Sequence, residues 1–328
     1  MKIIFDANGG DEPKHIIKGA VEASKEFNID AILVGNKSFI CDTLKELSYD
    51  KDKLTIINAS EKIENNEDPA FAIRKKRDSS ILVSLKLLKE GNGDTLISAG
   101  STGALLAGGL FIIGRIPSVK RAVLPTIIPG YKSSTMIIDS GANMDCDSSL
   151  LKQFAQMGSV FLEEYYGIKN PKIAILNVGS ERGKGNNLVK ETYEILEKTD
   201  LNFIGNVEAR DIPSTEANLV ICDGFSGNVL LKGIEGISEF ILKTLLYSFK
   251  NSEFGENNKV EIAKVFNSVS KKLDANEVGG TILLGLNKPI IKAHGNSNDH
   301  AIVNACRYAL DVYEKNIINT LKNKLGGN

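Results

Sequence analysis

Small polar residues and glycines gather in the stretch Ser98-Ala-Gly-Ser-Thr-Gly-Ala104. An apolar strand precedes this stretch and an apolar helix follows it, so unpaired backbone N–H groups and the positive end of the helix dipole meet at one point. One interpretation of such a turn is a binding site for an anion. Gly100 and Gly103 let a ligand approach the backbone, and the hydroxyls of Ser101 and Thr102 can cap the helix. A tight turn packed for its own sake explains the residues equally well, and the spacing is neither a Walker loop nor G-x-G-x-x-G.

A second stretch whose residues could bind or react with a ligand is Asn177-Val-Gly-Ser-Glu-Arg-Gly-Lys-Gly-Asn186. It holds two cations, one carboxylate, two amides and three glycines in ten residues. Isolated lysines usually face solvent. Lys184 stands between two glycines just beyond an apolar strand, and this position favours binding of an anion.

The same pattern, an apolar run followed by Asp, Asn, Ser or Gly, recurs at Asp6, Ser98, Asp139, Asn177, Gly205 and Asp223. In open α/β sheets, ligands bind beyond the carboxyl ends of the strands, so the repetition predicts one shared crevice. His294 follows the last apolar strand, beside Gly295, although a lone histidine is more often structural. Asp11 is a candidate N-cap of the first helix, and for it a purely structural role is favoured.

The elements that must position these residues begin with a strand over 2–6, a helix over 14–27 and further strands over 31–34 and 54–57. This β-α-β-α-β order predicts an α/β fold in three layers, α/β/α, with a mostly parallel sheet. Longer helices are expected at 69–90, 147–165 and 298–323, the last capped by Ser297. Two amphipathic helices, 229–249 and 259–272, flank a polar break at 251–258 and predict a helical hairpin or a dimer contact.

The composition narrows the range of functions that the protein could have. The 328 residues are 42% hydrophobic and 25% charged, with a net charge of −1, which argues against nucleic acid as a partner. The four cysteines lie far apart and the three histidines are scattered, so no metal site is expected. Neither a signal peptide nor an apolar run of the ~20 residues that cross a bilayer is evident. These features predict a cytoplasmic protein, and no cofactor is expected.

Taken together, the motifs resemble the bacterial acyl-[acyl-carrier-protein]:phosphate acyltransferases of phospholipid synthesis, over nearly the whole chain. The stretches that carry the resemblance are 6–11, 98–104, 141–143, 177–186, 205–211, 223–228 and 292–295. The resemblance implies an architecture related to phosphotransacetylases and isopropylmalate-type dehydrogenases. It also implies a single domain over 1–328, with a helical excursion at about 229–278, that forms a homodimer.

The implied reaction moves a fatty acyl group from the carrier thioester to inorganic phosphate and gives an acyl phosphate. Phosphate is already a nucleophile near neutral pH, so the enzyme must mainly position two reactants and stabilise an oxyanion. Positioning alone contributes ~7–11 kcal/mol. The expected catalytic residues are Lys184, Asn177, Asn228 and His294. The expected substrate-binding residues are Asp6, Gly9, Gly10, Ser98, Gly100, Ser101, Thr102, Gly103, Asn143, Glu181, Asp223 and Gly224.

The implied partners are acyl carrier protein, inorganic phosphate, a second copy of the chain, the inner face of the membrane and a downstream glycerol-3-phosphate acyltransferase. The acidic carrier is expected to dock on Arg74, Lys75, Lys76, Arg77 or Arg182, and the acyl chain in an apolar groove beside the 229–249 helix. Two alternatives stay open: a phosphotransacetylase that uses acyl coenzyme A, and a non-catalytic scaffold for lipid-synthesis enzymes. A nicotinamide-dependent dehydrogenase is disfavoured because no dinucleotide fingerprint is evident.

Overall fold

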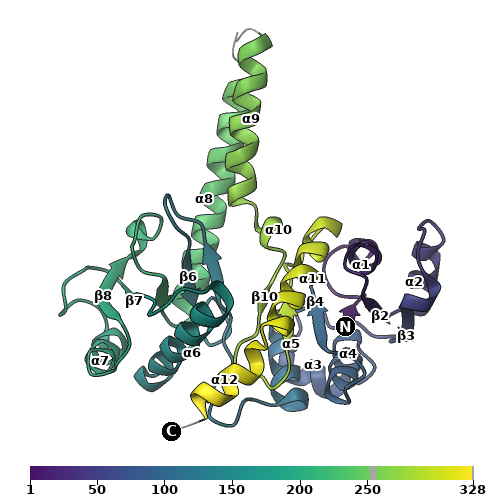
Figure 1. The fold of residues 1–328 in the computed structure, drawn as a ribbon, viewed down its shortest axis with the longest axis horizontal. Coiled ribbons are helices and arrows are strands. Elements are labelled where there is room, and N and C mark those ends of the chain that lie inside the picture. The colour runs from purple at the N-terminus through teal and green to yellow at the C-terminus, as the bar shows by residue number, and fades with distance from the viewer. Residues whose placement is uncertain (252–255, 327–328) are drawn as a thin grey trace.

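The computed structural model describes residues 1–251 and 256–326 and contains two sheets whose edges meet. The first sheet has the strand order β10-β11-β4-β1-β2-β3 and the second has the order β5-β6-β9-β7-β8. Figure 1 shows the two sheets on opposite sides of the molecule, with a pair of long helices rising between them. The edges are joined by antiparallel bridges from Arg115 to Leu286 and from Val123 to Leu284.

The six-stranded sheet is parallel except for its edge strand. Its strands are β1 (Lys2–Asp6), β2 (Asp30–Gly35), β3 (Leu54–Asn58), β4 (Thr95–Ser98), β11 (Ile290–Lys292) and the antiparallel β10 (Thr281–Ile282). One face packs on α1 (Pro13–Glu26) and α11 (Asp299–Glu314), and the other on α4 (Ser80–Lys89) and α5 (Thr102–Gly108). Because side chains alternate along a strand, Ile3 and Phe5 enter the first core and Ile4 enters the second.

The five-stranded sheet is also parallel except at its edge. Its strands are β5 (Thr126–Ile128), which is antiparallel, β6 (Thr135–Ile138), β7 (Ile173–Asn177), β8 (Phe203–Glu208) and β9 (Leu219–Ile221). One face packs against α6 (Ser148–Tyr166), and α7 (Asn187–Leu196) packs beside α6. The other face packs against the base of α8 (Gly224–Lys250) through Leu230, Leu231 and Ile234. The expected α/β/α arrangement with mostly parallel strands is therefore confirmed, and it is divided between two sheets.

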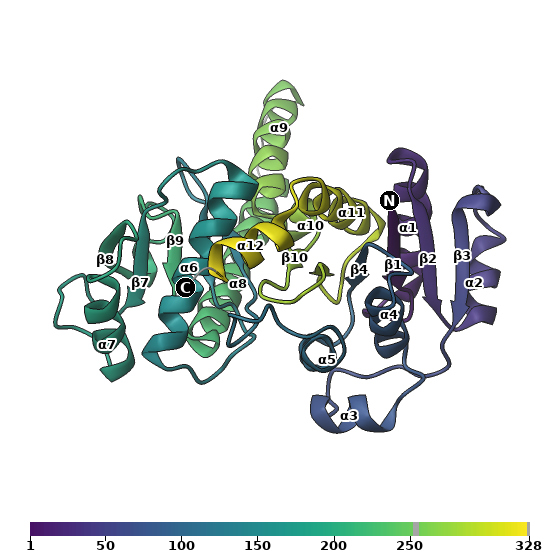
Figure 2. The ribbon, with the colours of Figure 1, turned by 60° about the horizontal axis from the view of Figure 1, so that its bottom comes forward.

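The predicted excursion at 229–278 falls on three helices, α8 (Gly224–Lys250), α9 (Glu256–Leu273) and α10 (Ala275–Val278). Helices α8 and α9 lie side by side and project away from both sheets (Figure 1 and Figure 2). Several large apolar side chains of α8 are exposed, including Ile237, Phe240 and Leu245. No helix in the described part of the chain is long and apolar enough to cross a membrane. Of the predicted polar break, residues 252–255 lie outside the described residues.

The helix predicted over 69–90 is wrong, because the chain forms two helices, α3 (Pro69–Lys75) and α4. Between them, Ser79 pairs with Glu61 in a parallel bridge, and the amide of Ser80 donates to the carbonyl of Glu61 at 3.2 Å. This long-range pairing holds the backbone extended where local helix propensity would continue the helix. The basic cluster Arg74-Lys-Lys-Arg77 therefore spans the end of one helix and the following turn.

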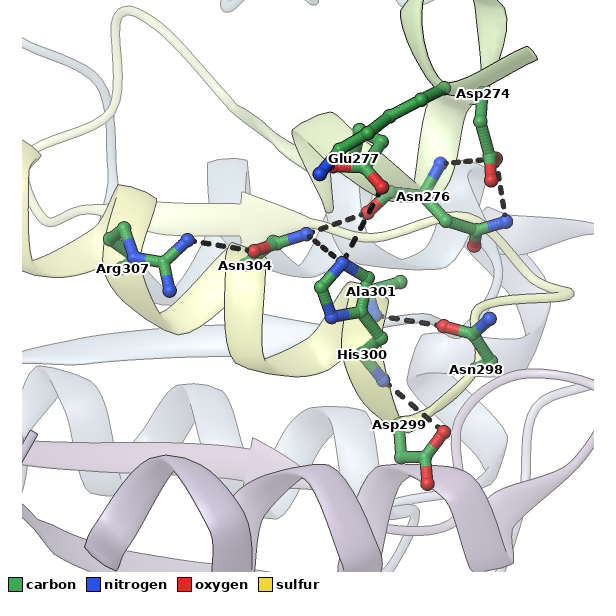
Figure 3. Close-up of polar contacts among 10 residues, drawn as sticks. Asp274, Asn276, Glu277, Asn298, Asp299, His300, Ala301, Asn304 and Arg307 are labelled. Carbon is green, nitrogen blue, oxygen red and sulfur yellow. Dashed lines mark hydrogen bonds and ion pairs between the residues drawn. The ribbon is translucent and has the colours of Figure 1, made fainter. Parts of the chain in front are cut away.

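The C-terminal prediction is also wrong in two respects. The helix expected over 298–323 is broken into α11 and α12 (Ile317–Leu325), because Asn316 adopts a left-handed conformation with φ of 53°. The N-cap of α11 is Asn298, whose side chain accepts a 2.9 Å hydrogen bond from the amide of Ala301, as Figure 3 shows. Ser297 is buried, and its hydroxyl finds no partner among the described residues.

Two further helix starts can be compared with the sequence. The first helix begins after Glu12, not after Asp11, and its cap makes no side-chain hydrogen bond. The amide of Asp11 instead donates to the carbonyl of Gly295 at 2.8 Å, which ties the first loop to the loop after β11. The cap expected at Ser101 is confirmed, since its hydroxyl accepts from the amide of Ala104 at 3.4 Å. The predicted apolar helix after it continues as a π-helix over 109–113.

Candidate functional site

Three neighbouring strand ends of the six-stranded sheet place Asp6, Ser98 and Lys292 in a row. Lys292 of β11 pairs with Ser98 of β4 in the parallel register, and β4 pairs in turn with β1. The hydroxyl of Ser98 donates to Asp6 Oδ2 at 2.6 Å and accepts from the amide of Gly100 at 3.1 Å. Residues in register on adjacent strands project from the same face of a sheet, so the row forms one polar edge. The hydrogen bond from the amide of Gly100 to Ser98 attaches the start of the glycine stretch at 98–104 to this edge.

The glycines around this row are required by close approaches of the backbone. A Cβ at Gly9 would stand 2.8 Å from Asp6 Oδ2 and 2.9 Å from the amide nitrogen of Gly100. Gly10 has φ of +73°, which disfavours other residues. A Cβ at Gly103 would stand 2.5 Å from Pro69 Cγ of α3. Gly103 therefore serves the packing of α3, whereas Gly9, Gly10 and Gly100 shape the loops over the polar row.

Burial dominates the electrostatics of the row. Asp6 is completely buried, and burial raises its pKa, an effect that the hydroxyls of Ser80 and Ser98 and the charge of Lys62 partly oppose. Desolvation lowers the pKa of Lys292 to about 8, against the opposing pull of two carboxylates. Desolvation also lowers the pKa of His294, and the Lys292 charge lowers it further, so His294 is neutral near pH 7.

Sequence reasoning did not select Lys292 as a site residue. The available signal was a lysine that closes the apolar strand Pro289-Ile-Ile-Lys292 immediately before Ala-His-Gly. A charged residue at the carboxyl end of a buried parallel strand is the pattern that did identify Asp6. The register that places Lys292 beside Ser98 joins segments almost two hundred residues apart, and the sequence does not reveal it.

The second cluster lies beyond β7 in the five-stranded sheet. The side-chain amide of Asn177 donates to the carbonyl of Lys184 at 3.1 Å, and its oxygen accepts from the amide of Val178 at 2.8 Å. Both polar ends of Asn177 are thus engaged by its own loop. Lys184 and Glu181 are exposed. Asn177 accordingly fixes the shape of a loop that presents a lysine to solvent.

Neighbouring loops of the same sheet lock together around the start of α8. Asp223 caps α8 by accepting from the amide of Ser226 at 2.8 Å. The amide of Gly224 donates to the carbonyl of Asn143 at 2.7 Å, and a Cβ at Gly224 would stand only 2.6 Å from that oxygen. The side chain of Asn143 donates in turn to buried Asp139 at 2.9 Å. Asn228, one turn into α8, faces Gly141.

Two apolar hollows flank α8. The larger has a volume of about 950 Å³ and runs from Asn177 and Asp223 along the helix past Val229, Gly233 and Ile237. The smaller has a volume of about 110 Å³ and lies between α8 and the loop of His294. Both hollows are lined mainly by aliphatic and aromatic side chains, which suits the hydrocarbon part of a ligand.

The predicted site residues therefore fall into two groups. The six-stranded sheet carries Asp6, Gly9, Gly10, Ser98, Gly100, Ser101, Thr102, Gly103 and His294. The five-stranded sheet carries Asn143, Asn177, Glu181, Lys184, Asp223, Gly224 and Asn228. Within each group, hydrogen bonds and close backbone approaches join several of the predicted loops. That both groups face one substrate remains a prediction.

Comparison with known proteins identifies the family. The family described as "Fatty acid synthesis protein" matches residues 1–320. A protein of Clostridium novyi (strain NT) named "Phosphate acyltransferase" is 44% identical over 327 residues, which cover 99% of this chain and 98% of that protein. A protein of the same name from Clostridioides difficile (strain 630) is 46% identical over 307 residues, covering 93% of this chain and 90% of that one. The chain belongs to the phosphate acyltransferase family.

Solved structures place this phosphate acyltransferase family member in a wider fold class. A phosphotransacetylase from Streptococcus pyogenes superposes with a TM-score of 0.62 at 19% identity, over 95% of this chain and 94% of the other. A 4-hydroxythreonine-4-phosphate dehydrogenase from Klebsiella pneumoniae gives a TM-score of 0.53 at 13% identity, over 95% and 97% of the two chains. At such low identity the likeness establishes the shared α/β fold alone. It agrees with the architecture expected from the sequence.

Proposed function

We propose that this member of the phosphate acyltransferase family transfers a fatty acyl group from acyl carrier protein to inorganic phosphate. The observation that carries the choice of a long acyl donor is the apolar groove of about 950 Å³ beside α8. A long hydrocarbon chain requires apolar surface of this extent, whereas the short acyl group of a phosphotransacetylase does not. The groove begins at Asn177 and Asp223, so a chain within it would end beside polar loops.

In the proposed reaction, a phosphate oxygen attacks the thioester carbonyl carbon. The new C–O bond forms, the C–S bond breaks, and the carrier leaves as a thiolate that takes up a proton. The glycine turn at 98–103 and Lys184 are the proposed contacts of the phosphate. Asn228 and neutral His294 are the proposed donors to the oxyanion or to the carrier's arm, and Asn177 positions the Lys184 loop. Each such donor acts by meeting charge that develops in the transition state.

The carrier-docking candidates differ in how free their charges are. Lys76 pairs with Glu67 at 2.5 Å, and Arg182 pairs with Glu197 at 2.5 Å. Arg74 and Arg77 line a groove of about 350 Å³ together with Lys86, Ile73, Leu82 and Phe111. Phe111 is 69% exposed. A groove with three cations around the exposed Phe111 suits an acidic amphipathic helix, so we assign carrier docking to this groove.

The remaining proposed partners rest on the projecting helices α8 and α9 and on the family resemblance. The apolar side chains on α8 are the proposed contact with a second copy of the chain, since an exposed stripe of this kind is typical of an interface. Contact with the inner face of the membrane, and delivery of the acyl phosphate to a glycerol-3-phosphate acyltransferase, are proposed from the family resemblance.

The deciding experiment is a thiol-release assay with and without phosphate, in which hydroxylamine traps any acyl phosphate. Long-chain acyl carrier protein and acetyl coenzyme A are compared as donors. Phosphate-dependent turnover of the carrier thioester alone supports the proposal. Turnover of acetyl coenzyme A alone indicates a phosphotransacetylase. If neither donor reacts while the protein still binds the carrier or lipid vesicles, the protein is a scaffold.

A further inference from the structure

The polar row at the end of the six-stranded sheet contains a cation, Lys292, that forms no close ion pair with a carboxylate of the described residues. The ammonium of Lys292 donates a hydrogen bond to the carbonyl of Ala293, and no ion pair between described residues includes Lys292. Its side chain is half-buried. Removing an ammonium group from water without a close counter-charge is unfavourable, so a protein that keeps one at a loop-covered sheet edge has a use for it.

Charged groups of both signs lie around Lys292. Asp6 and Asp11 raise the pKa of Lys292 from nearby, which favours its charged form, but both carboxyl groups have other bonds or neighbours. Asp6 Oδ2 accepts from Ser98. The carboxylate of Asp11 lies beside Gly295. A second cation, Lys62, donates to the carbonyl of Gly10 at 3.0 Å, on the loop next to Asp6. His294 is the remaining titratable neighbour, and it carries no charge near pH 7.

The row also holds a buried acidic group with spare hydrogen-bonding capacity. Asp6 Oδ1 is buried and finds no hydrogen-bond partner among the described residues. Because burial raises the pKa of Asp6, its proton is retained more readily than that of an ordinary aspartic acid. The same group holds Ser98, and through it the strand beside Lys292.

We infer that Lys292 binds the phosphate nucleophile, with Asp6 and Ser98 acting as positioning residues. This inference rests on the proposed acyl transfer to phosphate. A dianion gains more from a full positive charge than a neutral thioester carbonyl does, and the gain is larger at a half-buried site than at exposed Lys184. This adds to the proposed contacts at the glycine turn and Lys184 a phosphate contact at the strand end that precedes Ala293-His294-Gly295, next to the glycine turn after β4.

The test uses the full-length protein and three variants. Lys292→Met removes the charge while keeping similar volume, and Lys292→Arg keeps the charge. Lys89→Met, at an exposed position at the end of α4, is the matched control. Wild-type turnover is measured first with whichever thioester supports it, because its complete absence would refute the proposed function and not the role of Lys292. Thermal melting checks that each variant is folded.

Loss of the contact should raise the phosphate KM of Lys292→Met roughly 10- to 100-fold. This factor corresponds to the free energy that one hydrogen bond between charged groups contributes. The thioester KM should stay within about twofold of wild type, and direct phosphate binding followed by calorimetry should weaken by the same factor as the phosphate KM. Lys89→Met should match the wild type in every measurement. A normal phosphate KM in folded Lys292→Met, or a change confined to the thioester KM, would refute the inference.

A pH profile separates binding from a merely structural role. With a lysine pKa of about 8, the wild-type phosphate KM should rise roughly tenfold between pH 7 and pH 9 as the ammonium loses its proton. In Lys292→Arg the rise should vanish, since a guanidinium stays charged over this range. Asp6→Asn should shift the pH at which the phosphate KM rises, relative to the wild type, without abolishing phosphate binding. An unchanged alkaline rise in Lys292→Arg would overturn the assignment.

Discussion

Ser98 Oγ donates a 2.6 Å hydrogen bond to Asp6 Oδ2, which joins the carboxyl ends of β4 and β1 beneath the loops of the candidate site. The bond closes one side of a carboxyl group that is completely buried. It partly compensates the cost of burying that group, but the pKa of Asp6 remains raised. Burial of Asp6 therefore lowers the free energy of unfolding at neutral pH. Such a loss of stability is common where function requires a buried ionisable group.

The pH dependence of stability should reveal this cost. Because the folded state raises the pKa of Asp6 above 3.8, its stabilising contribution is complete below that pH and is lost as pH rises through the folded-state value. The wild type should therefore lose stability relative to Asp6→Asn as pH rises from 4 towards 7, in urea unfolding series.

Asp147 provides a control of opposite sign. It caps α6, and the hydroxyl of Ser149 and the amide of Leu150 hold its pKa below 3.8. Its contribution is present above that value and is lost as pH falls through the lowered pKa. Asp147→Asn should therefore be less stable than the wild type at pH 7, with the difference shrinking in acid. Equal pH slopes for wild type and Asp6→Asn would contradict the raised pKa of Asp6.

Lys184→Ala tests whether the loop of the five-stranded sheet takes part in phosphate binding. We expect the phosphate KM to rise or turnover to be lost, because the lysine is the exposed cation of a loop shaped by Asn177. Steady-state kinetics at varied phosphate measure this, with exposed Lys190→Ala of α7 as the control. Near-normal kinetics of Lys184→Ala would remove this lysine from the mechanism and leave the phosphate to the six-stranded sheet.

The acyl groove can be tested with two glycines of the same helix. A Cβ at Gly233 or Gly236 would meet open space, but only Gly233 is among the residues that line the groove. Leucine at either position raises helix propensity by a similar amount, about 1 kcal/mol. Gly233→Leu should reduce kcat/KM for long acyl chains roughly tenfold relative to short ones, since it fills space that the chain occupies.

Gly236→Leu should leave the chain-length preference unchanged. Assays with a series of acyl carrier thioesters of increasing chain length make the comparison directly. If both variants keep the wild-type preference, the acyl chain does not lie in this groove, and the smaller hollow beside His294 becomes the alternative.

Reversing charge at the basic groove should weaken carrier binding. Arg74→Glu combined with Arg77→Glu is expected to raise the KM for the acyl carrier thioester at least tenfold, because the variant repels an acidic partner. A thioester without the carrier, such as acyl pantetheine, should react as in wild type. Lys89→Glu, on the same face of the sheet but outside the groove, is the control. The wild-type KM should also rise with ionic strength.

An equal loss with acyl pantetheine would show that the double variant damages the site itself. An unchanged carrier KM would mean that the carrier docks elsewhere.

Local signals predicted most of the elements and the polar strand ends. Apolar runs of four to six residues located β1, β2, β3 and β7, and the small residues after β4 located the turn capped by Ser101. Local signals failed where distant segments intervened. Pairing with Glu61 broke the helix expected over 69–90, and a left-handed residue at Asn316 ended the helix expected to reach 323.

By itself, the sequence determined an α/β protein whose strands end in polar loops, and its motifs determined the family. Alternation and turn residues act within a few positions, so they are visible in one dimension. Only the tertiary structure divided the strand ends between two sheets, set Lys292 in register with Ser98 and joined Ser98 to Asp6 by a hydrogen bond. Strand order and register follow from packing between segments far apart in the chain, and the same packing set the burial that shifts the pKa of Asp6 and Lys292.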